Sequence, residues 1–417
     1  MSDNDTSVNN EVEVELSKEL GLKEALGIAV GALIGGGVFS VLGLVIYNSG
    51  PAAFLSFLLA GIVSSFTAFS YVHLALKYPK AGGAFIYVQE AFKKKWLSGT
   101  LGIVLWFGYS FSVSLYAMTF GRYLGEAIPI APGIEIFPGT SYAISISAFI
   151  FQILSVLLFI GLNLIGVKES TRAQNILVLV KVTILVVYII AGITAAHKSN
   201  FEGFFDKGFF PIVASSVLIF VSMEGFEILS NSVEEMKNPE RDLPVGMFLS
   251  IIIVLILYVS VAIVTIAVLG TQGVGEFKEV ILSVSASKFL GNAGIGIMVF
   301  AAIVSAASAI NATLLGSSRL SYMLSHEGII PKSLAKINPK TRVPARAITI
   351  SGILSIAFVL AFNIEIVALA ASIIFMFIFG AVNISAVKLL EGRKKIPSII
   401  GVILIVFYLI IWIISFF

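Results

Sequence analysis

Long apolar runs, separated by short polar or charged segments, extend through most of the chain. A helix needs about 20 apolar residues to cross the hydrocarbon core of a bilayer. These runs are too long and too evenly apolar for the alternating strands of a membrane barrel. We therefore predict an all-α membrane protein with eleven spans, at about residues 25–47, 53–76, 99–127, 143–165, 174–195, 211–232, 245–269, 289–323, 345–363, 366–387 and 397–417.

The first and sixth runs are interrupted near their centres. The first contains three consecutive glycines, Gly35 to Gly37, although a glycine inside a helix costs up to about 1 kcal/mol relative to alanine. The sixth contains "SMEGFE", residues 222–227, with two carboxylates. Interrupted helices at matching positions of two five-helix halves indicate an inverted-repeat transporter, because five is odd and the halves then have opposite topology.

This organisation predicts three parts. They are a polar cytoplasmic tail over 1–22, a ten-helix core over 23–390 with repeats at about 25–195 and 211–388, and an additional helix over 391–417.

The positive charges predict the orientation of the spans. With the N-terminus placed inside, 21 of the 27 Lys and Arg residues lie in cytoplasmic segments, 5 lie outside and one, Lys181, lies within a span. Cytoplasmic loops carry the excess of positive charge in membrane proteins. We expect a multi-pass protein of the cell membrane with its N-terminus in the cytoplasm and, because the span count is odd, its C-terminus outside.

Composition narrows the class of function. Hydrophobic residues make up 58% of the chain, charged residues 12%, and the mean hydropathy is +1.02, against roughly half apolar and a quarter charged in soluble domains. The absence of cysteine excludes disulfides, and the net charge of +3 without a basic patch gives no reason to expect a nucleic-acid partner. No cluster of metal ligands or catalytic set is visible, so we expect no cofactor, no metal and no enzymatic activity.

The glycines at 35–37 have two possible explanations. Non-helical backbone at membrane depth survives only where protein or a water-filled cavity surrounds it, and the half-helix that follows presents free N–H groups that attract an anion such as a carboxylate. Glycine also allows a ligand to approach the main chain closely. The alternative is close helix packing through small residues. The matching interruption in the sixth run favours a binding site.

Four stretches resemble the amino acid–polyamine–organocation (APC) superfamily of secondary transporters. They are "IGGGVF" in the first run, "YPKAGGAFIYVQEAF" at 78–92, "GFEILSNSVEEMKNPERDLP" at 225–244 and "NATLLGSSRLSYMLSHEGIIPK" from Asn311. The resemblance implies a five-plus-five inverted-repeat (LeuT-like) fold with the substrate between spans one and six. Many members have twelve spans, so the role of the eleventh helix here stays open.

The resemblance also implies a substrate site for a zwitterion. Half-helix N-termini attract anions and C-terminal carbonyls attract cations. Main-chain groups at Ile34, Gly35, Gly36 and Gly37 are then expected to hold a carboxylate, and carbonyls near Ala32, Leu33, Phe220, Val221 and Ser222 an α-ammonium.

Two carboxylates follow in span six, where charged side chains are costly and usually functional. Glu224 is expected at the substrate site, where it contacts a basic substrate group, pairs with Lys181 or takes a proton; a purely structural carboxylate is the alternative. Glu227 matches the glutamate of the G-[FV]-E element and is expected to act in gating.

Lys181 lies within "ILVLVKVTILVV" of span five. In one prokaryotic, proton-coupled branch of the superfamily, a lysine here occupies the space where related transporters bind sodium, and it takes up and releases a proton. The resemblance implies that Lys181 contacts carbonyls of the first-span break and the hydroxyls of Ser305 and Ser308 in span eight. The alternative is a lysine that extends its stem to the membrane surface.

Three functions therefore stay open: import of an amino acid by proton symport, exchange of amino acids or amines on the same fold, and a membrane enzyme or sensor. The expected partners are a small amino acid, a proton and the lipid bilayer. The side chain of the substrate and the oligomeric state cannot be read from the sequence.

Overall fold

The computed structural model describes residues 20–80, 82–136, 144–165, 171–272, 274–338, 341 and 343–414. Within these ranges the chain is almost entirely helical, apart from one short antiparallel hairpin of β1 (Glu135–Ile136) and β2 (Ile144–Ser145). The polar tail predicted for 1–22 lies almost wholly outside the described residues.

Each predicted span coincides with a described helix or with a pair of consecutive helices. The first span is the pair α1 (Leu22–Leu33) and α2 (Gly37–Ser49), and the sixth is α8 (Phe210–Ile219) followed by the 3₁₀ helix η4 (Phe220–Glu235). The other nine are α3 (Ala53–Lys77), α5 (Lys95–Ala127), α6 (Ile146–Ile165), α7 (Thr171–Gly192), α9 (Pro239–Leu269), α11 (Ile281–His326), α12 (Ala345–Ala361), α13 (Ile364–Leu389) and α14 (Lys395–Ile414).

Short helices connect the spans. Two of them, α4 (Gly83–Phe92) and α10 (Val274–Phe277), are α-helical. The others are one-turn 3₁₀ helices: η1 (Gly50–Ala52), η2 (Ile193–Ala195), η3 (Lys198–Phe201), η5 (Lys332–Ala335) and η6 (Gly392–Lys394).

By length and composition, nine segments of the described chain suffice to cross a membrane, against the eleven spans expected from the sequence. Two local features account for the difference. The segment Gly37–Lys77 joins α2 to α3 through η1, so it contains parts of two predicted spans. The helix α12 has 17 residues and falls just below the length of a full span.

Helix contacts repeat at an offset of five spans. The packing of α1 on α9 corresponds to that of α8 and η4 on α3, and the packing of α7 on α11 corresponds to that of α13 on α5. The two broken helices lie antiparallel, with α1 against η4 and α2 against α8. The protein therefore has the five-plus-five inverted-repeat fold in an all-α membrane architecture.

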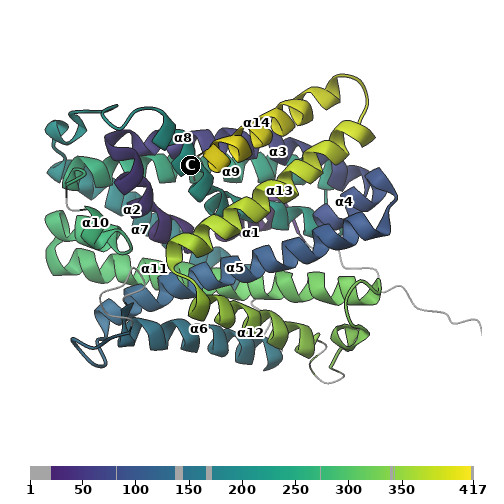
Figure 1. The fold of residues 1–417 in the computed structure, drawn as a ribbon, viewed down its shortest axis with the longest axis horizontal. Helices are drawn as coiled ribbons and strands as arrows, with labels where there is room; N and C mark the ends of the chain where they lie inside the picture. Colours follow the sequence, from purple (N-terminus) through teal and green to yellow (C-terminus); the bar gives the residue numbers. More distant parts are fainter. Residues whose placement is uncertain are drawn as a thin grey trace, which may run out of the picture.

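The eleventh helix packs on the core at span six. In Figure 1, α14 is the yellow helix beside α13, and it also contacts α3 and α8. The ring of Tyr408 on α14 lies edge-on to Phe220, with 5.7 Å between the ring centroids. Because Phe220 is the first residue of η4, the additional helix supports the junction inside span six.

Candidate functional site

The first span is broken between α1 and α2. Ile34 ends the first half with φ −82° and ψ 63°, while its N–H still donates to the Val30 carbonyl at 2.8 Å. The next residues, Gly35 and Gly36, lie outside any helix, and among the described residues their N–H groups donate to no backbone carbonyl. The break therefore provides main-chain donors at the start of α2, as a carboxylate site requires.

Side chains of α5 and α11 line this break at short range. A Cβ atom added at Gly35 would lie 3.1 Å from Ala309 Cβ and 3.2 Å from the ring of Tyr116, and one added at Gly36 would lie 3.0 Å from the same ring. Any larger residue at these two positions has to displace Tyr116. Glycine at positions 35 and 36 thus serves both purposes. It allows Tyr116 to pack closely, and it leaves the main chain accessible to a ligand.

The interruption in span six takes a form that the sequence did not indicate. The chain stays helical but changes from α to 3₁₀ geometry at Phe220, and the 3₁₀ geometry continues for 16 residues. Such helices rarely exceed three or four residues, and a longer stretch inside a span marks a hinge or a strained segment. The predicted substrate-site residues Phe220, Val221 and Ser222 form its first turn.

Two glycines bring the broken spans into direct contact. A Cβ atom at Gly225 would lie 2.4 Å from the carbonyl carbon of Ala32, and one at Gly37 would lie 2.3 Å from Ser222 Oγ. The backbone of η4 therefore rests on the end of α1. Ser222 Oγ itself is buried and has no hydrogen-bond partner within the described part of the chain.

Of the carbonyls expected to hold an ammonium, that of Leu33 already has a partner. Tyr258 of α9 donates its hydroxyl to the Leu33 oxygen at 2.7 Å. Tyr258 is fully buried and was not predicted as a site residue. A single sequence gives no signal for it, because one tyrosine in an apolar span has the same pattern as a packing residue.

Glu224 is connected to the break through Tyr116. Tyr116 donates its hydroxyl to Glu224 Oε1 at 3.0 Å, and Ser112 donates to Oε2 at 3.1 Å. The Tyr116 ring is the one that lines Gly35 and Gly36. The carboxylate is thus buried, accepts hydrogen bonds from neutral hydroxyls and is connected to the break through Tyr116.

Glu227 lies one 3₁₀ turn further along η4 and joins three spans. Tyr71 of α3 donates to its Oε2 and Tyr109 of α5 donates to its Oε1, both at 2.7 Å. All three side chains are buried. The sequence did not single out Tyr71, because a tyrosine in an apolar span has the same pattern as a packing residue.

Lys181 extends from α7 into the break of span one. Its Nζ atom donates to the Ile34 carbonyl at 3.1 Å, to Ser308 Oγ at 2.5 Å and, at the longer distance of 3.5 Å, to the Gly31 carbonyl. The residue is 1% exposed. The structure thus buries the Lys181 ammonium where span five meets spans one and eight.

Ser305, the other hydroxyl expected near Lys181, does not bond to it. Its Oγ atom is buried and has no hydrogen-bond partner among the described residues. Ser308, three residues further along α11, makes the contact with Lys181 instead.

Comparison with known proteins decides the family. The model of the amino acid permease family matches residues 20–417. The chain belongs to the amino acid permease family. This amino acid permease is 32% identical to an uncharacterized protein of Methanocaldococcus jannaschii over 94% of this chain and 89% of the relative. It is 27% identical to the methylthioribose transporter of Bacillus subtilis, over 92% of this chain and 83% of the relative. It is also 27% identical to the branched-chain amino acid permease BcaP of the same organism, over 93% of this chain and 83% of the relative.

Family membership settles the broad activity. The protein is a multi-pass membrane permease of the APC type that transports amino acids, and both Bacillus subtilis relatives are named as transporters or permeases rather than enzymes. The alternative of a membrane enzyme or sensor is therefore rejected.

Proposed function

We propose that this permease imports an amino acid by proton symport, with the substrate between the broken helices and Lys181 as the proton carrier. The observation that carries the proposal is the position of Lys181 Nζ, which bonds a carbonyl of the substrate-site break at 3.1 Å and Ser308 of span eight at 2.5 Å. A change of charge on Lys181 thus acts directly on the backbone that would hold the substrate.

The proposed binding of the substrate rests on main-chain N–H donors and carbonyl acceptors at the two broken helices. The N–H groups at Gly35 and Gly36 provide donors for a carboxylate at the start of α2. Ser222 Oγ lies beside Gly37, buried and without a partner among the described residues, so it offers a further hydrogen bond to a ligand. Carbonyls of α1 and the first turn of η4 would receive the α-ammonium.

The proposed coupling of the proton to transport rests on the N–H donors of Lys181. A protonated lysine has three N–H donors, and the acceptors near Lys181 Nζ include Gly31, Ile34 and Ser308. On deprotonation the amine loses its charge and one donor, so the bridge between spans five, one and eight weakens. A proton that binds one conformation of the protein more tightly than another shifts the equilibrium toward the first conformation. Protonation would thus stabilise the conformation in which these spans are joined.

Uptake into proteoliposomes tests the proposal against exchange. The purified permease is reconstituted without internal amino acid, and a panel of radiolabelled amino acids is supplied with and without an inward proton gradient. Symport predicts accumulation above the external concentration only when the gradient is present. Uptake that requires internal amino acid and ignores the gradient would identify an exchanger instead.

A further inference from the structure

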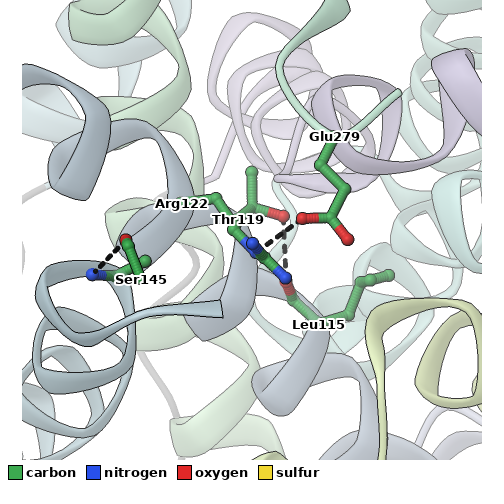
Figure 2. Close-up of polar contacts among 6 residues, drawn as sticks. Leu115, Thr119, Arg122, Ser145 and Glu279 are labelled. Atoms are coloured by element: carbon green, nitrogen blue, oxygen red, sulfur yellow. Dashed lines mark hydrogen bonds and ion pairs between the residues drawn. The ribbon is translucent and has the colours of Figure 1, made fainter. Parts of the chain in front are cut away.

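An ion pair that the central site does not use joins two segments at one end of the bundle. Arg122, near the end of α5, places Nε 2.5 Å from Oε2 of Glu279, which lies between α10 and α11 (Figure 2). The two side chains are 25% and 21% exposed, so water screens this pair only partly. The charge bias of the loops predicts this end to be external.

A cavity adjoins Arg122. It is formed by α5, by the start of α6 with β2, and by the turn between α12 and α13. Its polar lining residues are Arg122, Gln152 and Asn363, and its apolar walls include Met118, Phe149 and Phe362. The volume of ≈ 50 Å³ holds a group of the size of a carboxylate. The cavity combines a guanidinium, two amides and apolar walls.

Arg122 is connected to the centre of the protein through its own helix. Thr119, three residues before Arg122, donates its hydroxyl to the Leu115 carbonyl at 2.9 Å (Figure 2). A Cβ atom at Gly36 would lie 3.2 Å from Thr119 Oγ1. One turn of α5 therefore separates Arg122 from Thr119, which contacts the break in span one.

The segment that carries Glu279 rests on the second half of span one. A Cβ atom at Gly43 of α2 would lie 2.0 Å from the Lys278 carbonyl oxygen, so only glycine allows this approach. The ion pair between Glu279 and Arg122 thus holds this segment across α2 and against α5.

We propose that Arg122 is a first binding site for the carboxylate of an amino acid that enters from outside, and that this carboxylate replaces Glu279 as its partner. Guanidinium groups bind carboxylates through two parallel hydrogen bonds, and the cavity has room for that group. Loss of the Glu279 contact releases the segment from α5 and opens the path along α2. The proposal rests on the proposed import function, because it assigns the direction of entry.

Thiol labelling tests this site without any gradient. The chain has no cysteine, so Phe149→Cys introduces a single thiol into the partly exposed wall of the cavity. The probes are an anionic sulfonatoethyl and a cationic trimethylammonium-ethyl methanethiosulfonate, applied to the reconstituted full-length permease. We expect the anionic reagent to react several-fold faster, and L-leucine but not L-leucinamide to slow it, because leucinamide lacks the carboxylate.

Four further variants show which residue is responsible for the protection. Arg122→Gln should abolish the protection by L-leucine, whereas the charge-preserving Arg122→Lys should keep part of it. Glu279→Gln removes the competing carboxylate, so it should strengthen the protection. Gly36→Leu obstructs the central site, and protection that persists in this variant comes from the cavity even if proton coupling fails.

Three results would overturn the proposal. Equal protection by L-leucinamide would show that the carboxylate is not recognised. Protection that survives Arg122→Gln in a folded protein would exclude the guanidinium. Loss of protection in Gly36→Leu would place the bound leucine at the central site instead.

Discussion

A single ammonium group, that of Lys181, contacts the backbone break of span one and a hydroxyl of span eight. Ser308 makes its shortest hydrogen bond, whereas Ser305, one helical turn away on the same helix, makes none among the described residues. The two serines therefore form a matched pair for testing whether the contact itself matters.

We predict that Ser308→Ala lowers proton-driven uptake about ten-fold or more. A hydrogen bond from a charged group contributes about 1.5–3 kcal/mol, and its loss weakens the bridge that Lys181 makes. Ser305→Ala removes a hydroxyl without a partner and should leave uptake unchanged. Initial rates in proteoliposomes under a fixed gradient measure both variants, and equal losses in the two would show that Ser308 acts only through packing.

Glu227 yields a prediction about stability. Glu227→Leu leaves the hydroxyls of Tyr71 and Tyr109 buried without their acceptor, and each buried unpaired donor costs about 1–3 kcal/mol. We expect a clear drop in the melting temperature in detergent. Glu227→Gln keeps an oxygen acceptor and should lose less. A melting temperature unchanged in Glu227→Leu would contradict the role of the carboxylate in joining α3, α5 and η4.

The sequence singled out some of the residues that the structure brings together at the candidate site and missed others for a physical reason. Glycines and charges inside apolar runs are costly, so Gly35, Glu224 and Lys181 stand out from their neighbours. Tyr71 and Tyr258 cost little in a span and were missed, because their hydroxyls gain significance only from distant partners. The ion pair of Arg122 with Glu279 was missed likewise, since the two residues lie far apart in the chain.

At the scale of elements, the apolar pattern predicted where the helices lie. It did not predict the change from α to 3₁₀ geometry inside span six. The break at Gly35 and Gly36 follows from three consecutive glycines. In span six, the residues from Phe220 onward keep a helical pattern, and the sequence does not distinguish α from 3₁₀ geometry there. The sequence also does not reveal that the missing side chain of Gly225 allows the Ala32 backbone to lie against η4.

The break in span one gives a prediction for a whole element. Gly36→Leu should abolish substrate binding, because the side chain displaces Tyr116 and Thr119 and covers the donors of α2. Gly161→Leu is the control, since no atom lies within 4 Å of a Cβ added at that position of α6. Ligand-induced thermal shift, with the amino acid identified by uptake, measures binding. Normal binding by a folded Gly36→Leu protein would favour simple helix packing.

At the scale of the whole molecule, contacts join the two repeats at both ends of the central site. At one end, Leu20 N–H donates to the Glu235 carbonyl at 3.0 Å and Lys237 N–H donates to the Leu20 carbonyl at 2.8 Å. At the other end lies the ion pair of Arg122 with Glu279. Alternating access requires that these two sets of contacts open in turn.

The orientation of the molecule is a prediction of the charge bias. Lys198, in η3, and Lys394, in η6, are exposed at segments predicted to lie outside and inside the cell respectively. We expect a membrane-impermeant maleimide to label Lys198→Cys in intact cells and Lys394→Cys only after permeabilisation. The reverse pattern would invert the topology and with it the direction of transport.

Proton-driven accumulation by Lys181→Ala tests the central claim most directly. Wild-type protein and variant are reconstituted at equal density, and uptake of the amino acid found in the substrate panel is followed under an imposed proton gradient alone. The account predicts that the wild-type protein concentrates the amino acid and that Lys181→Ala does not, although exchange of internal for external amino acid persists and shows that the variant is folded. If Lys181→Ala still concentrates the amino acid under a proton gradient alone, then Lys181 does not carry the coupled proton and the proposed mechanism is wrong.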